Sequence, residues 1–247
     1  MKEVDGVNYY NISEICEMFH NRLSQDEIEA HFQTNKIHGI KIEDQWYAKK
    51  EALDEFEEEV IYKEIYFSEL HQIDLKKIQL KGRILDIGGG GEGIIGQLAG
   101  PHVISIDPSE RELKEAPSDC LKIIMNGKDL KFLDESFNTI TLFFTMMYIP
   151  RPDHKKVFKE IYRVLKSKGE IFLWDLTIPD RPETEKDTYA IKLEVDIGDK
   201  KISAGYGTRW GQKINMQRYL DLGKNLGLKV IEQKVNGETF FIKYQKE

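Results

Sequence analysis

The chain has 247 residues, a net charge of −7, 40% hydrophobic and 32% charged side chains, and a mean hydropathy of −0.50. These values exclude a disordered chain and a membrane-spanning one, because the longest apolar run, residues 140–149, is too short to cross a bilayer. Cys16 and Cys120 lie far apart and outside a C-x-x-C spacing, which excludes a disulfide framework and a thiolate zinc site. No secretory signal pattern opens the chain, so we expect a cytoplasmic protein without a metal site and without membrane contact.

Residues 1–57 form a first predicted domain. One helix is predicted to begin near Ser13 and a second near Ser24, residues 37–48 ("IHGIKIEDQWYA") predict a hairpin, and residues 49–56 predict a third helix. This order resembles the small winged helix-turn-helix domains of MerR-type regulators and excisionases. The resemblance implies a fold that binds DNA.

The charge of this domain argues against DNA as its partner. Residues 1–57 contain six Lys and Arg against thirteen Asp and Glu, whereas the rest of the chain has thirty of each, so the whole net charge lies here. Asp26, Glu27 and Glu29 lie in the helix that would enter a DNA groove, where carboxylates repel phosphates. We therefore expect substrate capture, dimerisation or protein docking, and a homodimer stays open.

A helical connector is predicted over residues 58–81 and the main domain over residues 82–247. In the main domain strand-like segments alternate with helical ones, which predicts a parallel sheet. Asn236-Gly237 is a two-residue turn signal between two strand-like runs, so the sheet is expected to end in an antiparallel hairpin. The parallel strands are predicted at "RILDIG", "HVISID", "LKIIM", "NTITLFF" and "GEIFLWD".

A glycine-rich turn follows the first of these strands. Gly88, Gly90 and Gly93 have the G-x-G-x-x-G spacing of a dinucleotide-binding turn. Asp86 and Glu92 flank the turn and would oppose the charge of a pyrophosphate. They would instead favour a ligand with a cationic end, such as S-adenosylmethionine (SAM). A tight turn with solvated acids is the alternative.

Further along, residues 123–149 ("IIMNGKDLKFLDESFNTITLFFTMMYI") and residues 160–175 ("EIYRVLKSKGEIFLWD") match two more motifs. Together with the glycine turn and with Asp107 at the end of the second strand, they resemble the class I SAM-dependent methyltransferases, in particular the methyltransferase domain of menaquinone biosynthesis. The resemblance covers most of residues 60–247 and implies an α/β fold, a Rossmann-like sheet of seven strands that is mostly parallel and closes with the antiparallel hairpin.

The resemblance also implies SAM as cofactor, with S-adenosylhomocysteine (SAH) as its product. Four places depart from the family pattern: Glu92 stands where the last glycine is usual, and Asn126 stands where an acid usually contacts adenine. Asn138 replaces the acid after Phe137, and Ser167-Lys168-Gly169 replaces Pro-Gly-Gly. The implied cofactor contacts are Asp86, Gly88, Gly90 and Glu92 in the turn, Asp107 and Pro108 at the ribose, Asn126, Gly127 and Lys128 at the adenine, and Phe144 beside the cofactor.

Methyl transfer from a sulfonium needs alignment above all, so catalytic candidates are chosen by position at the carboxyl ends of the strands. Tyr148 follows the fourth strand, His154 opens the next helix and Asp175 ends the fifth strand; core packing, capping or surface exposure is the alternative for each. The acceptor is a small molecule or a protein. An RNA methyltransferase and a DNA-binding regulator that responds to SAM remain alternatives.

An insertion of about residues 180–212 separates the fifth strand from the last helix. Its two alternating halves around Gly198-Asp199 predict an extra β-hairpin. Tyr206, Arg209 and Trp210 bring stacking and cationic groups that suit a substrate contact or a mobile lid. A hairpin that only extends the sheet or pairs two subunits is the other interpretation.

Overall fold

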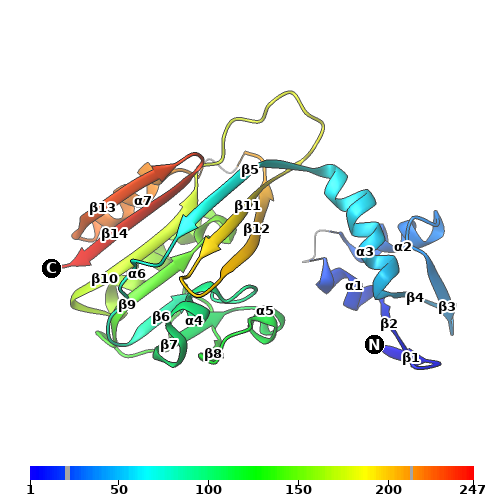
Figure 1. Ribbon diagram of the computed structural model, residues 1–247, viewed down its shortest axis with the longest axis horizontal. Coiled ribbons are helices and arrows are strands. Elements are labelled where there is room, and N and C mark those ends of the chain that lie inside the picture. The colour runs from blue at the N-terminus through cyan, green and yellow to red at the C-terminus, as the bar shows by residue number, and fades with distance from the viewer. Residues whose placement is uncertain (20–22, 212–213) are drawn as a thin grey trace. The chain divides into compact units, whose positions relative to one another are not determined.

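The computed structural model describes residues 1–19, 23–211 and 214–247, which form two compact units (Figure 1). The first unit is Met1–Tyr66 with Glu185–Asp187, and the second is Phe67–Thr184 with Thr188–Glu247. The first unit therefore extends beyond the predicted boundary at residue 57. None of the helices in the described part of the chain combines the length and the apolar character needed to cross a bilayer.

The first unit is a four-stranded antiparallel sheet with three short helices. Asn11 and Ser24 begin the first two helices, and each forms a capping box with the glutamate three residues later, Glu14 or Glu27. The three predicted helices and the predicted hairpin are present. Residues 20–22, between the first two helices, lie outside the described residues. The helices are α1 (Ile12–Met18), α2 (Gln25–Gln33) and α3 (Lys50–Phe56), and the strands, in sheet order, are β1 (Lys2–Val4), β2 (Val7–Asn11), β4 (Gln45–Lys49) and β3 (Gly39–Ile42).

The predicted helical connector over residues 58–81 is wrong beyond Glu64. Two short turns, η1 (Glu57–Ile61) and η2 (Tyr62–Glu64), continue the helix, and the chain then becomes the strand β5 (Ile65–Asp74). This strand pairs with β11 of the insertion, and the backbone N–H of Leu75 donates to the carbonyl of Asp196 at 2.9 Å. The pairing partner lies more than a hundred residues away, so helical periodicity near the strand could not reveal it.

The second unit is built on a seven-stranded sheet in the order β13-β14-β10-β9-β6-β7-β8. The five strands from β10 to β8 run parallel, and β14 is antiparallel to both β10 and β13, as predicted. Gly237 in the turn between β13 and β14 has φ +58°, which the Asn-Gly pair supplies readily. The strands are β6 (Ile84–Ile87), β7 (Val103–Asp107), β8 (Leu121–Ile124), β9 (Phe137–Phe143), β10 (Leu165–Leu176), β13 (Leu228–Asn236) and β14 (Thr239–Lys246).

Helices and the insertion cover this sheet. The helices are α4 (Ile94–Ala99), α5 (Glu110–Glu115), α6 (His154–Val164) and α7 (Met216–Asn225). Three short helical turns are η3 (Gly100–His102), η4 (Met146–Tyr148) and η5 (Arg151–Asp153). The insertion forms β11 (Thr188–Asp196) and β12 (Lys201–Arg209), an antiparallel pair that β5 extends to three strands; residue 212 of its predicted span lies outside the described residues.

The insertion and the pair α6/α7 lie on opposite faces of the sheet (Figure 1). Tyr219 of α7 contacts Asp175 of β10, whereas the neighbouring side chain, Trp174, points the other way and packs on Phe143. Phe143 in turn contacts Tyr206 of β12. Because successive side chains of a strand alternate between faces, β12 must lie over the face away from α7, at the carboxyl end of β9.

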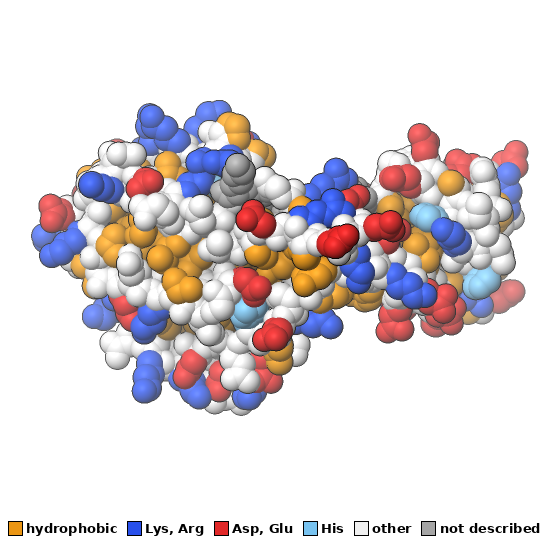
Figure 2. Space-filling model, turned by 90° about the horizontal axis from the view of Figure 1, so that it is seen from above, with side chains coloured by type: hydrophobic (Ala, Val, Ile, Leu, Met, Phe, Trp, Pro, Cys, Tyr) orange, Lys and Arg blue, Asp and Glu red, His pale blue; other side chains and the backbone are white. Residues whose placement is uncertain are grey.

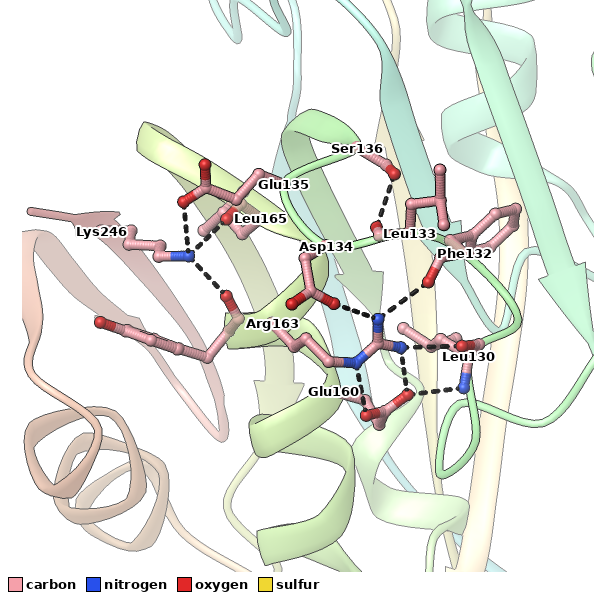
Figure 3. Close-up of polar contacts among 11 residues, drawn as sticks. Leu130, Phe132, Leu133, Asp134, Glu135, Ser136, Glu160, Arg163, Leu165 and Lys246 are labelled. Carbon is pink, nitrogen blue, oxygen red and sulfur yellow. Dashed lines mark hydrogen bonds and ion pairs between the residues drawn. The ribbon is translucent and has the colours of Figure 1, made fainter.

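Arg163 fastens the loop between β8 and β9 to α6 (Figure 3). Its guanidinium donates to both carboxylate oxygens of Glu160 at 2.7 and 2.9 Å, to Asp134 at 2.8 Å, and to the carbonyls of Leu130 and Phe132 at 2.8 Å each. The backbone N–H of Leu130 donates to Glu160 at 2.8 Å. The planar guanidinium of arginine can donate to all these acceptors at once, which holds the loop between β8 and β9 against α6.

Lys246 makes a second anchor close to this one (Figure 3). It is nearly buried, and its ammonium donates to the carbonyls of Tyr162 and Leu165 at 2.9 and 2.7 Å, at the carboxyl end of α6. A cation at that end of a helix satisfies carbonyls that lack a partner within the helix. The last strand is thus tied to the helix that carries Arg163.

Candidate cofactor and active site

The glycine turn folds back over the end of β6. Gly88 has φ +75°, and its N–H donates to the carbonyl of Ile106 in β7 at 2.8 Å. A side chain at Gly88 would collide with Thr145, and one at Gly90 would collide with Glu112. Both positions therefore require glycine, which lets the backbone of the turn fold tightly at the carboxyl edge of the sheet.

Two aspartates lie beside the glycine turn, Asp86 one residue before the end of β6 and Asp107 at the end of β7. Asp86 is 2% exposed and accepts hydrogen bonds from Thr141 Oγ1 at 2.7 Å and Ser105 Oγ at 3.5 Å, and burial raises its pKa to about 7. Asp107 ends β7 and accepts from the N–H of Ser109 at 2.8 Å, and burial raises its pKa as well. Pro108 follows in an exposed position. Both carboxyls lie close to the backbone of the glycine turn.

The segment after β8 reaches the same edge. The N–H of Met125 donates to the carbonyl of Asp107 at 3.1 Å. Asn126 is exposed and accepts from the N–H of Lys128 at 3.0 Å, and the ammonium of Lys128 pairs with Asp153 at 2.9 Å. Gly127 between them is buried. The structure thus brings together the three segments that were predicted from motifs far apart in the chain.

The insertion reaches this edge through Tyr206. Its ring lies nearly parallel to that of Phe144, with centroids 5.0 Å apart and planes 6° apart, and its hydroxyl donates to Glu92 at 3.4 Å. Phe144 is almost fully buried and has φ +50°, an uncommon value for a side chain of this size. The hydroxyl of Tyr148 accepts from the N–H of Gly207 at 3.2 Å. Strand β12 therefore contacts both the glycine turn and the loop after β9.

Residues 85–173 match the family described as methyltransferase domain. A demethylmenaquinone methyltransferase of Listeria welshimeri is 31% identical over 121 residues, covering 44% of this chain and 50% of the relative. A sterol 4-C-methyltransferase of Caenorhabditis elegans is 30% identical over 147 residues, covering 59% and 41%. The chain thus spans about half, or less, of the length of these curated relatives.

Solved structures agree on the fold. A SAM-dependent methyltransferase of Methanosarcina mazei is similar with a TM-score of 0.50 and 17% identity over 68% of this chain and 94% of that one. A Pyrococcus horikoshii protein is similar with a TM-score of 0.51 and 19% identity over 70% and 86%. Residues 85–173 of the second unit thus match a methyltransferase domain, and the unit has the fold of these SAM-dependent methyltransferases. SAM is the cofactor of this class of domain.

The methyltransferase domain fits the cofactor at two observable points. Glycine at positions 88 and 90 lets the turn pack directly against Thr145 and Glu112, which holds its backbone beside the carboxyls of Asp86 and Asp107. Asp86, Glu92 and Asp107 form no ion pair with any described lysine, arginine or histidine, which suits a sulfonium and an ammonium. Among the described residues no group of acids, histidines or cysteines is arranged to hold a metal ion.

His154 is placed in the packing of the methyltransferase domain. It is fully buried, its Nε2–H donates to the carbonyl of Ile149 at 2.8 Å, and its Nδ1 accepts from Nε of Arg218 at 3.2 Å. Burial lowers its pKa, which keeps the ring neutral in this tautomer. With both ring nitrogens engaged, His154 stabilises the contact between α6 and α7, and we give it no step in the proposed reaction.

Asp175 is also enclosed. It lies fully buried between β10 and α7, accepts from the N–H of Leu176 at 2.8 Å and from the hydroxyl of Tyr219 at 3.3 Å, and burial raises its pKa to about 7. Of the three catalytic candidates, Tyr148 is the one that stays open to solvent, with 56% of its surface exposed.

The pH dependence of stability should reveal Asp175. A pKa raised from 3.8 to about 7 means that the folded protein keeps a proton that the unfolded chain releases, so the free energy of unfolding falls as the pH rises from about 4 to about 7. The shift corresponds to roughly 4 kcal/mol at most. We expect Asp175→Asn to flatten this fall in thermal unfolding followed from about pH 4 to 8, with Asp86 supplying the remaining slope.

The exposed Asp129→Asn serves as the matched control, and its curve should superimpose on that of the unaltered protein. An equally steep fall in Asp175→Asn and in the control would contradict the assignment of a buried, protonated Asp175.

The other lid candidates lie at the end of β12. Trp210 packs on Tyr189 with ring centroids 4.9 Å apart, and Arg209 is exposed. The hydroxyl of Tyr206, by contrast, donates to Glu92 in the glycine turn, so Tyr206 links the insertion to that turn.

Thr141 and Ser105 are the site residues that the sequence reasoning missed. Both are completely buried partners of Asp86. The signal was present: each is a polar residue inside an otherwise apolar strand, "NTITLFF" and "HVISID". A buried hydroxyl needs a partner, and a buried carboxyl on the neighbouring strand is the natural one.

Proposed function

We propose that the protein transfers the methyl group of SAM to a small-molecule acceptor. The observation that carries the proposal is the meeting of the glycine turn, Asp107 and the segment after β8 at one edge of the sheet that contains the methyltransferase match. The curated relatives, named for demethylmenaquinone and for a sterol, support a small acceptor over a protein or an RNA. Because the chain spans only part of those relatives, their acceptors do not identify its own.

In this proposal each contact has one task. Asp107 accepts hydrogen bonds from the ribose hydroxyls, the turn from Asp86 to Glu92 holds the methionine end, and Asn126 with the backbone of Gly127 and Lys128 meets the adenine. When bound, SAM supplies an activated methyl group and leaves as SAH. Phe144 and Tyr206 exclude water from that group, and the aligned acceptor then gains the benefit of preorganisation, on the order of 7 to 11 kcal/mol.

Two measurements test the proposal. Titration calorimetry should show stoichiometric binding of SAH, and SAM labelled in its methyl group should transfer the label to a member of a metabolite panel. Absence of SAH binding would contradict the assignment of the cofactor site. Transfer to RNA or to a protein, but to none of the small molecules, would replace the acceptor class.

We further propose that β12 acts as a lid. It is the edge strand of its sheet, so its outward N–H groups lack a strand partner and instead meet the site: Gly205 donates to Glu92 and Gly207 to Tyr148. Glycine at these two positions allows the backbone to move, and the aromatic ring of Tyr206 between them packs on Phe144.

Amide hydrogen exchange over residues 203–210 should therefore slow when SAH is added. The largest change is expected at Gly205 and Gly207, whose hydrogen bonds depend on the closed position of β12, and the smallest at amides that pair with β11. The control is β14, which should not respond. Full protection of Gly205 and Gly207 without ligand would instead make the hairpin a static part of the fold.

For the first unit we propose docking or substrate capture in place of DNA binding. Figure 2 shows many Asp and Glu side chains over this unit, and Asp26, Glu27 and Glu29 are all exposed on α2. Gel-shift titration of the full chain at low salt, the condition that most favours phosphate contacts, is expected to show no binding of arbitrary duplex DNA. Binding at micromolar concentrations would favour the regulator that responds to SAM.

A further inference from the structure

Glu92 is held by the insertion as well as by its own turn. Its carboxylate accepts from the hydroxyl of Tyr206 at 3.4 Å and from the N–H of Gly205, both in β12. The turn itself closes through Gly93, whose φ of +55° caps α4, so the fold of the turn does not need an acid at position 92. These contacts instead hold the Glu92 carboxylate between the glycine turn and β12.

The aromatic rings beside Glu92 form a wall suited to a cation. Phe144 and Tyr206 are stacked, and Tyr148 reaches the same strand through Gly207. Burial and the neighbouring Glu92 hold the pKa of Tyr206 well above its usual range, so this phenol stays neutral and donates to the carboxylate. Tyr148, with 56% of its surface exposed, is the ring of this group that stays open, and an aromatic face next to a carboxylate attracts an ammonium group.

The charges at this edge point the same way. Glu92, Asp86 and Asp107 all have raised pKa values because burial disfavours their charged forms, and Glu112 adds to the effect on Glu92 and Asp107. The described groups that face Glu92 from β12 and α5 are the hydroxyl of Tyr206, the N–H of Gly205 and Glu112. The cation on α5, Arg111, pairs with Glu112 at 2.7 Å and with Glu115 at 3.2 Å. An acceptor that must ionise to a phenolate, thiolate or enolate would meet repulsion here, whereas an ammonium would be attracted.

We propose that the methyl acceptor is an amine and that Glu92 is the catalytic residue that takes its proton. This inference rests on the proposed methyltransferase function. The Glu92 carboxylate accepts one proton from the bound ammonium, the freed nitrogen lone pair forms the new bond to the methyl carbon, and the electron pair of the breaking carbon–sulfur bond stays on sulfur. Glu92 releases its proton to water after the methylated ammonium leaves. Tyr206 positions the carboxylate for this step.

Three small molecules of similar shape but different charge test whether the site prefers an ammonium group. Benzylamine, benzyl alcohol and benzoate are titrated by calorimetry into the full chain saturated with SAH at neutral pH. We expect the charged amine to bind at least about ten-fold more tightly than the alcohol, and benzoate to bind most weakly. Equal binding of the amine and the alcohol, or a preference for benzoate, would overturn the inference.

Variants test the part played by Glu92. Glu92→Gln keeps the size and a hydrogen-bond acceptor for Tyr206 but cannot take a proton, so the ten-fold preference for benzylamine over the alcohol should disappear. Turnover of the best amine in the panel should fall roughly 10²- to 10⁴-fold at neutral pH and recover towards about pH 10, where the free amine is already neutral. Tyr206→Phe should lower turnover less than Glu92→Gln does, and its turnover should depend on pH in the same way as that of the unaltered protein.

Glu115→Gln and Tyr162→Phe are the controls, because both residues lie outside the site. A loss in Glu92→Gln that does not recover at high pH would show that Glu92 is not the proton acceptor. A large loss of SAH affinity in that variant with unchanged turnover would make Glu92 a cofactor ligand only. Failure of the unaltered protein to bind SAH would instead contradict the proposed function itself, so the two failures are distinct.

Discussion

Replacing Asp107 by alanine is expected to weaken SAH binding by about 10- to 150-fold, equivalent to roughly 1.5 to 3 kcal/mol. The carboxylate ends β7 beside the glycine turn, where we propose that it accepts hydrogen bonds from both ribose hydroxyls. A charged acceptor makes stronger hydrogen bonds than a neutral one, so Asp107→Asn should lose less than Asp107→Ala.

Titration calorimetry with SAH measures the effect, and Asp119→Ala, an exposed aspartate between β7 and β8, is the control. Asp107 also accepts from the N–H of Ser109 at the start of α5, so circular dichroism is needed to show that the variant is folded. A folded Asp107→Ala with the affinity of the unaltered protein would remove Asp107 from the cofactor site.

Replacing Arg163 by alanine is expected to lower the free energy of unfolding by about 2 to 4 kcal/mol. The guanidinium serves Glu160, Asp134 and two backbone carbonyls, and its removal leaves these acceptors without their donor (Figure 3). The side chain is about one-third exposed, so water replaces part of the loss and the estimate stays below that for a fully buried pair.

Urea unfolding monitored by fluorescence gives the free energy. Lys159→Ala, an exposed position on the same helix, should change it by less than about 0.5 kcal/mol. Arg163→Lys should recover little of the loss, because a single ammonium cannot reproduce the planar fork. If Arg163→Ala unfolds at the same urea concentration as the unaltered protein, the anchor contributes nothing to stability.

Local patterns determined the main architecture. Each parallel strand is an apolar run with its own turn signals, and Asn236-Gly237 specifies a tight antiparallel hairpin by the conformations its two residues adopt. The glycine turn is likewise visible in the local sequence, because Gly88, Gly90 and Gly93 follow directly on an apolar strand with the spacing of a ligand-binding turn. These features depend on neighbours within a few residues, so the sequence alone revealed them.

The tertiary structure decided what depends on distant partners. β5 became a strand because β11 offers it an edge, and Asp86 stays buried because Ser105 and Thr141 arrive from the adjacent strands. His154 and Asp175 stand at positions where catalysis was predicted, yet the packing of α6 and α7 encloses both.

The contact of Tyr206 with Glu92 joins residues 114 apart in the chain. From the sequence, the insertion could be interpreted as a lid or as a plain hairpin. The stack between β12 and the loop after β9 joins distant segments, so neither segment carries a local pattern that predicts it. Only the fold places Tyr206 on Phe144, because the alternation of side chains across β10 and the pairing of β12 with β11 fix which face the insertion covers.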